Sequence, residues 1–291
     1  MAFFSCQFLL PGLRFFHNSP TPLQQTGQEI LIRRIGIIGY GYLGSYLYEQ
    51  LKTHPEWGLE VAFVHSRSDN HDGLPEALHY TDIDLALDQR PDLVVEVAHA
   101  EITTLYGNRI LERSSYMPLS VSALADAALE SQILATATQN GTTLYVPHGA
   151  ATGLDTLAEC RDLWESVVVT MKKHPRNLDF SAAPQHHPAA ITTETVLFDG
   201  STRQICAQFP RNVNTHAAVA LAGIGFDRTR SVLIADPTLE ESVIEIQARG
   251  EGISLDIARR NPLKGVSGVL TLRSALGCLL RVGRREAIEI V

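Results

Sequence analysis

The stretch Arg34-Ile35-Gly36-Ile37-Ile38-Gly39-Tyr40-Gly41-Tyr42-Leu43-Gly44 predicts the fold of the first half of the chain. Its isoleucines are typical of a short, buried parallel strand, and the apolar period then becomes helical as far as Leu51. Gly39, Gly41 and Gly44 lie at the G-x-G-x-x-G spacing where strand and helix meet. In such a turn the first glycine makes the tight bend, the second lets a pyrophosphate approach the backbone, and the third allows close helix–strand packing.

This turn predicts a dinucleotide site, because a phosphate there would meet unpaired N–H groups at the positive end of the following helix. A turn with a purely structural purpose is the alternative. The residues predicted to hold the cofactor, NAD or NADP, are Gly39, Tyr40, Gly41, Tyr42, Leu43 and Gly44.

The end of the next predicted strand, 59–64, bears on the choice between the two cofactors. An NAD-specific site places Asp or Glu about 20 residues beyond the glycines, where it accepts from the ribose hydroxyls. This chain instead continues as His65-Ser66-Arg67-Ser68. Arg67 is therefore predicted to contact the cofactor, and NADP, or use of both cofactors, is favoured. A solvated loop arginine is the alternative.

Strands and helices alternate from 33 to 150, which predicts a Rossmann-type, doubly wound parallel sheet. The run 92–99 reads as a central strand, and 116–121 and 144–146 as two more. Glu96 is the polar member of the central strand, so its carboxylate needs donors or a shifted pKa.

The pattern changes after Gly153 to that of an α+β domain on a mostly antiparallel sheet. Asp199-Gly200 and Gly250-Glu251-Gly252 are typical of hairpin turns. We therefore expect an extension at 1–32, disordered or loosely attached, a dinucleotide-binding domain at 33–150, a substrate and dimerisation domain at 151–262, and a C-terminal helix at 263–291 that returns to the first domain. The expected helices of the second part are 154–164, 212–223 and 269–280, and the expected strands are 166–172, 193–197, 203–207, 230–235, 242–247 and 253–258.

Composition favours a small-molecule substrate. A net charge of −8 and a pI near 5.8 argue against a nucleic-acid partner or an anionic membrane surface. The four cysteines have no C-x-x-C spacing, so no metal site is predicted, and no apolar run is long enough to span a bilayer. We expect a cytoplasmic location, with a mitochondrial one as the alternative, and a homodimer formed through an edge of the second domain's sheet.

Several blocks together give the chain a resemblance to the L-aspartate dehydrogenase family, related to dihydrodipicolinate reductase and homoserine dehydrogenase. The resemblance implies NAD(P)-dependent oxidation of L-aspartate to iminoaspartate, which is hydrolysed to oxaloacetate and ammonia or passed on to nicotinamide biosynthesis. It also implies that Ala123 and Asn214 contact the dinucleotide. The blocks are the glycine turn, 92–98, 120–124 with Asp126, 146–150 with 153–155, 209–214, 220–230, 235–237 and 261–262.

One position departs from the family pattern. The family carries a histidine, thought to be the general base, where this chain has Ile244 in Ser242-Val243-Ile244-Glu245-Ile246. Isoleucine takes no proton, and losing an acid–base group typically costs about 10²–10⁴-fold in rate. His216 is the candidate substitute, although a packing histidine is the alternative. The rival hypothesis is an NAD(P)-binding protein with reduced or lost catalysis.

Substrate charge suggests a further set of residues. L-Aspartate carries two carboxylates, so its site needs cationic or bidentate donors. The predicted substrate contacts are Lys172, Lys173 and Asn212. For the two lysines, surface residues at a strand end are the alternative.

Overall fold

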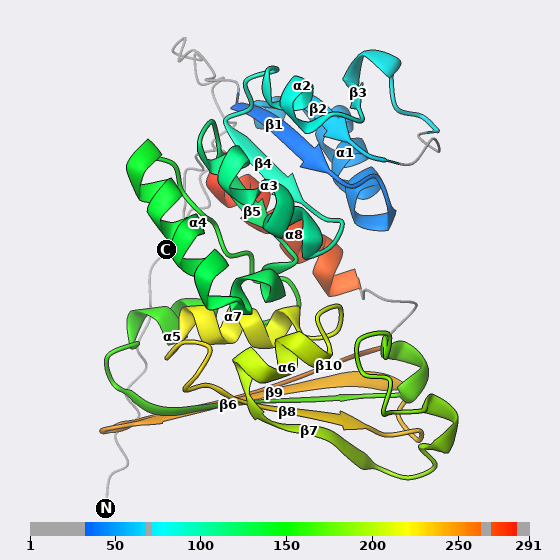
Figure 1. Cartoon of the computed structure of the whole chain (residues 1–291), viewed down its shortest axis with the longest axis vertical. Coiled ribbons are helices and arrows are strands. Elements are labelled where there is room, and N and C mark those ends of the chain that lie inside the picture. The colour runs from blue at the N-terminus through cyan, green and yellow to red at the C-terminus, as the bar shows by residue number, and fades with distance from the viewer. Residues whose placement is uncertain (1–32, 68–71, 263–268, 284–291) are drawn as a thin grey trace, which may run out of the picture. The chain divides into compact units, whose positions relative to one another are not determined.

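The computed structural model describes residues 33–67, 72–262 and 269–283, and the predicted extension at 1–32 lies outside the described residues. The described residues belong to one unit, which contains two five-stranded sheets. Sheet A has the order β3-β2-β1-β4-β5 and is parallel throughout, which confirms the predicted Rossmann-type sheet (Figure 1). Its strands are β1 (Arg33–Ile38), β2 (Leu59–His65), β3 (His79–Tyr80), β4 (Leu93–Glu96) and β5 (Ser115–Pro118).

Apolar strands build the centre of sheet A. Ile35, Ile37 and Ile38 are buried in β1, as the opening stretch predicts, and every residue of β4 is buried. The predicted strand at 144–146 is wrong, because Leu144 makes a single bridge to Tyr116. The helices between the strands are α1 (Tyr42–Thr53), α2 (Ile83–Leu87), α3 (Glu101–Leu111) and α4 (Ala127–Asn140), and a short 3-10 helix, η3 (Val121–Ala125), follows β5.

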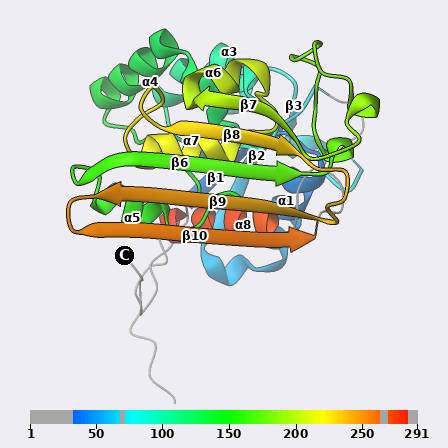
Figure 2. The ribbon, with the colours of Figure 1, turned by 90° about the horizontal axis from the view of Figure 1, so that it is seen from below.

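Sheet B has the order β10-β9-β6-β8-β7 and is antiparallel except between β6 and β8, which confirms the predicted mostly antiparallel sheet (Figure 2). Gly250-Glu251-Gly252 turns the chain from β9 to β10 as predicted, and Gly252 has a φ of 74°. The strands are β6 (Trp164–Lys173), β7 (Thr195–Ser201), β8 (Arg230–Ala235), β9 (Glu241–Gly250) and β10 (Ile253–Pro262).

Two local predictions in this domain are wrong. Asp199 and Gly200 do not form a hairpin turn, because they lie within β7 and pair with β8. The predicted strand at 203–207 is the helix α6 (Thr202–Gln208). A capping box begins this helix: the Ser201 hydroxyl accepts from the Gln204 N–H, and the Gln204 side chain accepts from the Ser201 N–H.

Three helices pack on one face of sheet B: α5 (Leu154–Glu159), which is shorter than the predicted 154–164, α6 and α7 (Asn214–Ala222) (Figure 2). Seven of the nine residues of α7 are buried, which suits a helix enclosed between layers. α7 contacts β6 on one side and η3 on the other, so it joins sheet B to the end of β5.

The last described helix, α8 (Val269–Gly283), packs against α1. Ala275, Leu276 and Leu279 share a buried cluster with Leu47 and Leu51 of α1. The Sγ of Cys278 in α8 accepts a hydrogen bond from the His148 N–H at 3.4 Å. α8 therefore supports the loop after the first domain as well as the glycine-turn helix.

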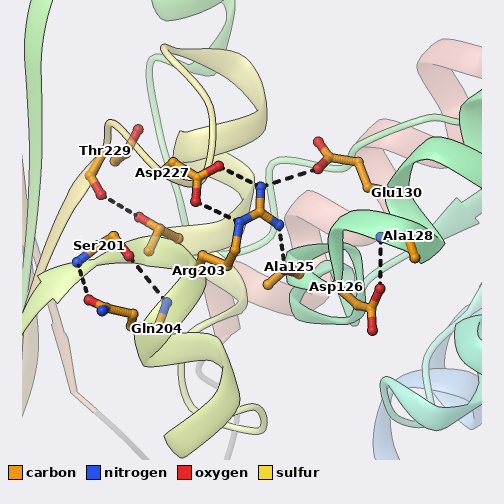
Figure 3. Close-up of polar contacts among 10 residues, drawn as sticks. Ala125, Asp126, Ala128, Glu130, Ser201, Arg203, Gln204, Asp227 and Thr229 are labelled. Atoms are coloured by element: carbon orange, nitrogen blue, oxygen red, sulfur yellow. Dashed lines mark hydrogen bonds and ion pairs between the residues drawn. The ribbon is translucent and has the colours of Figure 1, made fainter.

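Arg203 of α6 ties the second half of the chain to the first (Figure 3). Its guanidinium makes two hydrogen bonds to the Asp227 carboxylate, at 2.7 and 2.8 Å, and lies 3.6 Å from Glu130 of α4. It also donates to the backbone carbonyl of Ala125 in η3. One side chain thus connects α6, α4 and η3, and fixes the segment after β5.

We expect Arg203→Met to lower the free energy of unfolding by about 2 kcal/mol, because the Ala125 carbonyl and the Glu130 carboxylate lose a charged donor. Urea denaturation measures the change. Arg230→Met is the matched control, since Arg230 makes a similar two-bond pair with Asp199 on the outer surface. If Arg203→Met lowers the free energy of unfolding no more than Arg230→Met does, the connection that Arg203 makes between α6, α4 and η3 does not stabilise the fold as described.

Candidate active site

The glycine turn has the geometry that a dinucleotide requires. Gly39 has a φ of 102°, a conformation that disfavours side chains. A Cβ on Gly44 would lie 1.9 Å from the Gly39 carbonyl oxygen, so this glycine lets α1 approach β1. A Cβ on Gly41 would meet no atom within 4 Å, which leaves open space beside the backbone. This cradle fits a pyrophosphate at the start of α1.

Glu96 organises the ends of two neighbouring strands beside this turn. Its carboxylate is fully buried and accepts from the Ala98 N–H at 2.6 Å, the Ser120 N–H at 3.0 Å and the Ser120 hydroxyl at 3.1 Å. Burial raises the pKa of Glu96 to about 7, although these donors act in the opposite direction. Glu96 therefore fixes the backbone at Ala98 and Ser120.

This raised pKa predicts a pH dependence of stability. The folded pKa, about 7, exceeds the ordinary value of 4.5, so folding favours the protonated acid and stability falls as pH rises between these values. From pH 5 to 7.5 we expect Glu96 to account for a loss of about 2 kcal/mol in the free energy of unfolding. Urea titrations at the two pH values measure the free energy of unfolding, and Glu96→Gln should not show this loss. An equal change between pH 5 and 7.5 in both proteins would contradict the attribution of the pH dependence to Glu96.

A cavity of about 610 Å³ extends from the glycine turn to sheet B. Tyr42 and Leu43 of the turn helix, Ala98 after β4 and Ser120 after β5 line one side. His148 lines the cavity as well. Its pKa is lowered, mainly because the side chain is partly buried. The cavity therefore adjoins the carboxyl ends of the parallel strands, where open α/β sheets bind ligands.

The floor of the cavity is formed by three adjacent strands of sheet B. Ile244 of β9 pairs with Met171 of β6 on one side and with Arg259 of β10 on the other. One step along the same face, Ser242 pairs with Asn261. We call six cavity-lining residues the floor: Met171, Lys173, Ser242, Ile244, Arg259 and Asn261.

The floor is cationic and has unused hydrogen-bonding groups. Among the described residues, no acidic side chain pairs with Lys173 or Arg259, and the described lining of the cavity includes no Asp or Glu. The Nε of Arg259, the Oγ of Ser242 and the Oδ1 of Asn261 are buried without a partner. Unpaired buried polar groups are costly, so this arrangement favours an anionic, hydrogen-bonding ligand.

Lys173 has an altered acidity. Protein atoms around its ammonium exclude much of the water, and this desolvation, with the positive charge of Arg259, lowers the pKa of Lys173 to about 8. The residue as a whole remains partly exposed, because it lines the cavity. Lys173 therefore changes its charge in the neutral to mildly alkaline range.

The other predicted cofactor contacts lie in different places. Asn214 lines the cavity, and its Oδ1 accepts from the Ser122 N–H at 3.0 Å, which joins α7 to η3. Ala123 lies in η3 and packs partly buried against the core, outside the described lining of the cavity. Arg67 is exposed after β2, with its guanidinium 3.5 Å from the His99 ring.

The structure brings Lys173 to the cavity, but the other two predicted substrate contacts have no free group there. Lys172 lies outside the cavity lining and forms an ion pair with Glu194 at 3.2 Å. Asn212 reaches the lining, but its amide is used by the backbone of Asp179 at 2.9 and 2.7 Å.

His216 is 0% exposed, lies outside the described lining, and has both ring nitrogens unpartnered. Burial and the charge of Lys173 lower its pKa to about 3. This placement supports the packing alternative.

Arg259, Ser242 and Asn261 line the cavity but are not among the site residues predicted from the sequence. A usable signal was present: in β10 the alternation of Ile253, Leu255 and Ile257 places Arg259 on the same, inner face. A cation in an apolar series on a covered face indicates a site rather than a surface charge.

Comparisons with known proteins agree with this architecture. Residues 39–147 match the model described as homoserine dehydrogenase, NAD binding domain, and residues 155–282 match aspartate dehydrogenase, C-terminal. The first match and the turn geometry confirm NAD or NADP as the cofactor. No helix in the described part of the chain is long and apolar enough to cross a membrane.

Three relatives illustrate the similarity. An aspartate dehydrogenase domain-containing protein of Xenopus tropicalis is 33% identical, over 85% of this chain and 93% of its own. An L-aspartate dehydrogenase of Cupriavidus necator is 33% identical, over 88% and 99%. The crystal structure of aspartate dehydrogenase from Thermotoga maritima shares the fold, with a TM-score of 0.68, 21% identity and coverage of 89% and 98%. This chain belongs to the L-aspartate dehydrogenase family and is an NAD(P)-dependent oxidoreductase.

Proposed function

We propose that the protein oxidises L-aspartate to iminoaspartate, with NAD or NADP as the hydride acceptor, and that water then converts the product to oxaloacetate and ammonia. The unpaired groups of the floor carry this proposal, since the Arg259 guanidinium matches a substrate carboxylate and Ser242 and Asn261 offer further hydrogen bonds to it. The names of the relatives, L-aspartate dehydrogenase among them, support the same substrate.

The residues of the glycine turn, 39–44, would hold the pyrophosphate, and Asn214 and the segment around Ala123 would border the nicotinamide end. When bound, the nicotinamide ring supplies a two-electron acceptor for the hydride from the substrate Cα. Arg67 at the end of β2 would meet the adenosine ribose, where it favours a 2′-phosphate.

The floor would bind and orient the substrate. Arg259 offers a planar fork of donors that matches a carboxylate, and Ser242 and Asn261 offer hydrogen bonds beside it. Ile244 and Met171 form the apolar part of the floor and exclude water near the reacting carbon.

An assay of purified protein with each cofactor tests this function. We expect L-aspartate to drive formation of reduced nicotinamide, followed at 340 nm, while L-asparagine and L-alanine react far more slowly because each lacks one carboxylate. Absence of turnover and of aspartate binding with either cofactor would contradict the proposal.

Ile244 favours a second candidate, an NAD(P)-binding protein whose catalysis is reduced or lost. Its side chain is 2% exposed and lies in the floor, at the position where the resemblance implies a histidine. This candidate predicts cofactor binding with turnover near background, and a gain of activity in Ile244→His. A wild type at least as fast as that variant would exclude it.

We also propose a homodimer formed through sheet B. Helices cover one face of this sheet (Figure 2). The strand register places Val168, Val232 and Val196 on the other face, and Val196 is 57% exposed, so this face replaces the sheet edge expected from the sequence as the proposed contact. Sedimentation equilibrium tests the dimer, and Val196→Asp should weaken it. A cytoplasmic location is proposed as well, since Cys160, Cys206 and Cys278 are free thiols.

A further inference from the structure

Oxidation of an amino acid at Cα needs a proton acceptor as well as a hydride acceptor. The substrate nitrogen enters as an ammonium, whose lone pair is tied up in an N–H bond. It must lose a proton before the C–H electron pair departs and the nitrogen lone pair forms the C=N bond. With isoleucine at position 244, the floor has no imidazole to accept that proton.

We propose that Lys173 is the proton acceptor of this reaction, in place of an imidazole at position 244. This inference rests on the proposed oxidation of L-aspartate. In the step, the neutral amine of Lys173 takes a proton from the substrate ammonium. The Cα–H bond then breaks with its electron pair leaving as hydride to the cofactor, and the nitrogen lone pair forms the C=N bond.

The register of sheet B places Lys173 suitably for this step. Lys172 pairs with Val243, so the next residue, Lys173, lies beside Ser242 and about 8 Å, Cα to Cα, from Ile244. An extended lysine side chain spans most of this distance. The amine of Lys173 can therefore reach the part of the cavity that an imidazole at position 244 would occupy. Lys173 lines the cavity with Ile244, whereas Lys172 lies outside the described lining.

The surroundings of Lys173 keep its amine available. The positive charge of Arg259 in β10 lowers the pKa of Lys173, and the charge of Lys173 in turn lowers the pKa of His216 in α7. The other titratable groups nearby, Arg211 and His148, line other parts of the cavity. Among the described residues no carboxylate of the lining pairs with it, so nothing holds the ammonium form. Desolvation and Arg259 both favour the neutral amine, in line with the pKa near 8.

His148 and His216 are weaker candidates for the proton acceptor because of where they lie relative to the floor. His216 is buried outside the lining. His148 lines the cavity, but it lies on the loop supported by α8 rather than on the floor strands.

The test combines binding and pH-dependent turnover in the full-length protein saturated with NADP⁺. For the wild type, kcat/KM for L-aspartate should rise with pH up to about 8 and then level, because the lysine must be neutral to act. Lys173→Arg keeps the positive charge but cannot lose a proton at these pH values. It should retain aspartate binding by calorimetry within about tenfold and lose kcat by about 10²–10⁴-fold.

Lys173→Met should lose turnover to the same extent, and Lys172→Met, on the neighbouring residue paired with Glu194, should turn over like the wild type. NADP⁺ affinity and thermal unfolding confirm that each variant is folded. Wild-type kcat and pH profile in Lys173→Arg would overturn the proposal, as would a wild type that binds aspartate without oxidising it. Failure of the wild type to bind aspartate at all would instead contradict the proposed substrate.

Discussion

Arg259→Met is expected to raise the KM for L-aspartate by about a hundredfold or more while leaving NADP⁺ affinity unchanged. The guanidinium lies on the cavity floor without a carboxylate partner among the described residues, and its Nε is buried and unpaired. Removing one partner of a desolvated charge pair costs about 2–5 kcal/mol, and each 1.4 kcal/mol is tenfold in affinity. Steady-state kinetics with saturating cofactor measures the change.

The next residue supplies the matched control for this prediction. Arg260 points to the opposite face of β10, where it is exposed and forms an ion pair with Glu241 at 3.4 Å. Arg260→Met should therefore change the KM by less than about twofold. Equal effects of the two substitutions would show that the arginines act through the general positive charge of the sheet, and would contradict a specific carboxylate contact at Arg259.

Gly44→Ala is expected to destabilise the first domain strongly and to abolish cofactor binding. The new Cβ would lie 1.9 Å from the Gly39 carbonyl oxygen and 2.9 Å from its carbon. Both atoms are backbone, so α1 must move away from β1, which costs about 3 kcal/mol or more. Urea denaturation measures the stability, and quenching of protein fluorescence by NADP⁺ measures the affinity.

Gly41→Ala separates folding from binding in the same turn. A Cβ at Gly41 meets nothing within 4 Å, so this variant should fold with nearly wild-type stability. It should still bind the dinucleotide weakly, because the methyl group occupies the space beside the backbone that the pyrophosphate needs. Wild-type cofactor affinity in Gly41→Ala would place the phosphates elsewhere.

Local signals in the sequence predicted the parts of the fold that depend on neighbouring residues. The glycine turn could be read from its spacing, and the structure places an open cradle at Gly41. The turn at Gly250-Glu251-Gly252 could be read because a φ of 74° at Gly252 suits glycine. The helix α6 was mistaken for a strand because it is short, and its capping box, Ser201 with Gln204, carried the correct signal.

The floor could not be predicted in the same way, because it depends on long-range register. Ile244 pairs with Met171, far earlier in the chain, and with Arg259 on the neighbouring strand. In β6 the consecutive valines 167–169 obscure the alternation of apolar and polar residues, so the sequence does not tell which of Lys172 and Lys173 faces the helices. The fold and the cofactor turn were therefore predictable, whereas the floor residues, apart from Arg259, needed the assembled sheet.

We expect the cationic floor of the cavity to select an amino acid with two carboxylates. Calorimetric titration of L-aspartate and L-asparagine into the NADP⁺-saturated protein tests this selection most directly, because the two ligands differ in one ionised carboxylate. We expect L-aspartate to bind at least about fiftyfold more tightly than L-asparagine, and Arg259→Met to remove most of this difference. Equal affinities in the wild type, or a preference that survives in Arg259→Met, would contradict selection by the floor.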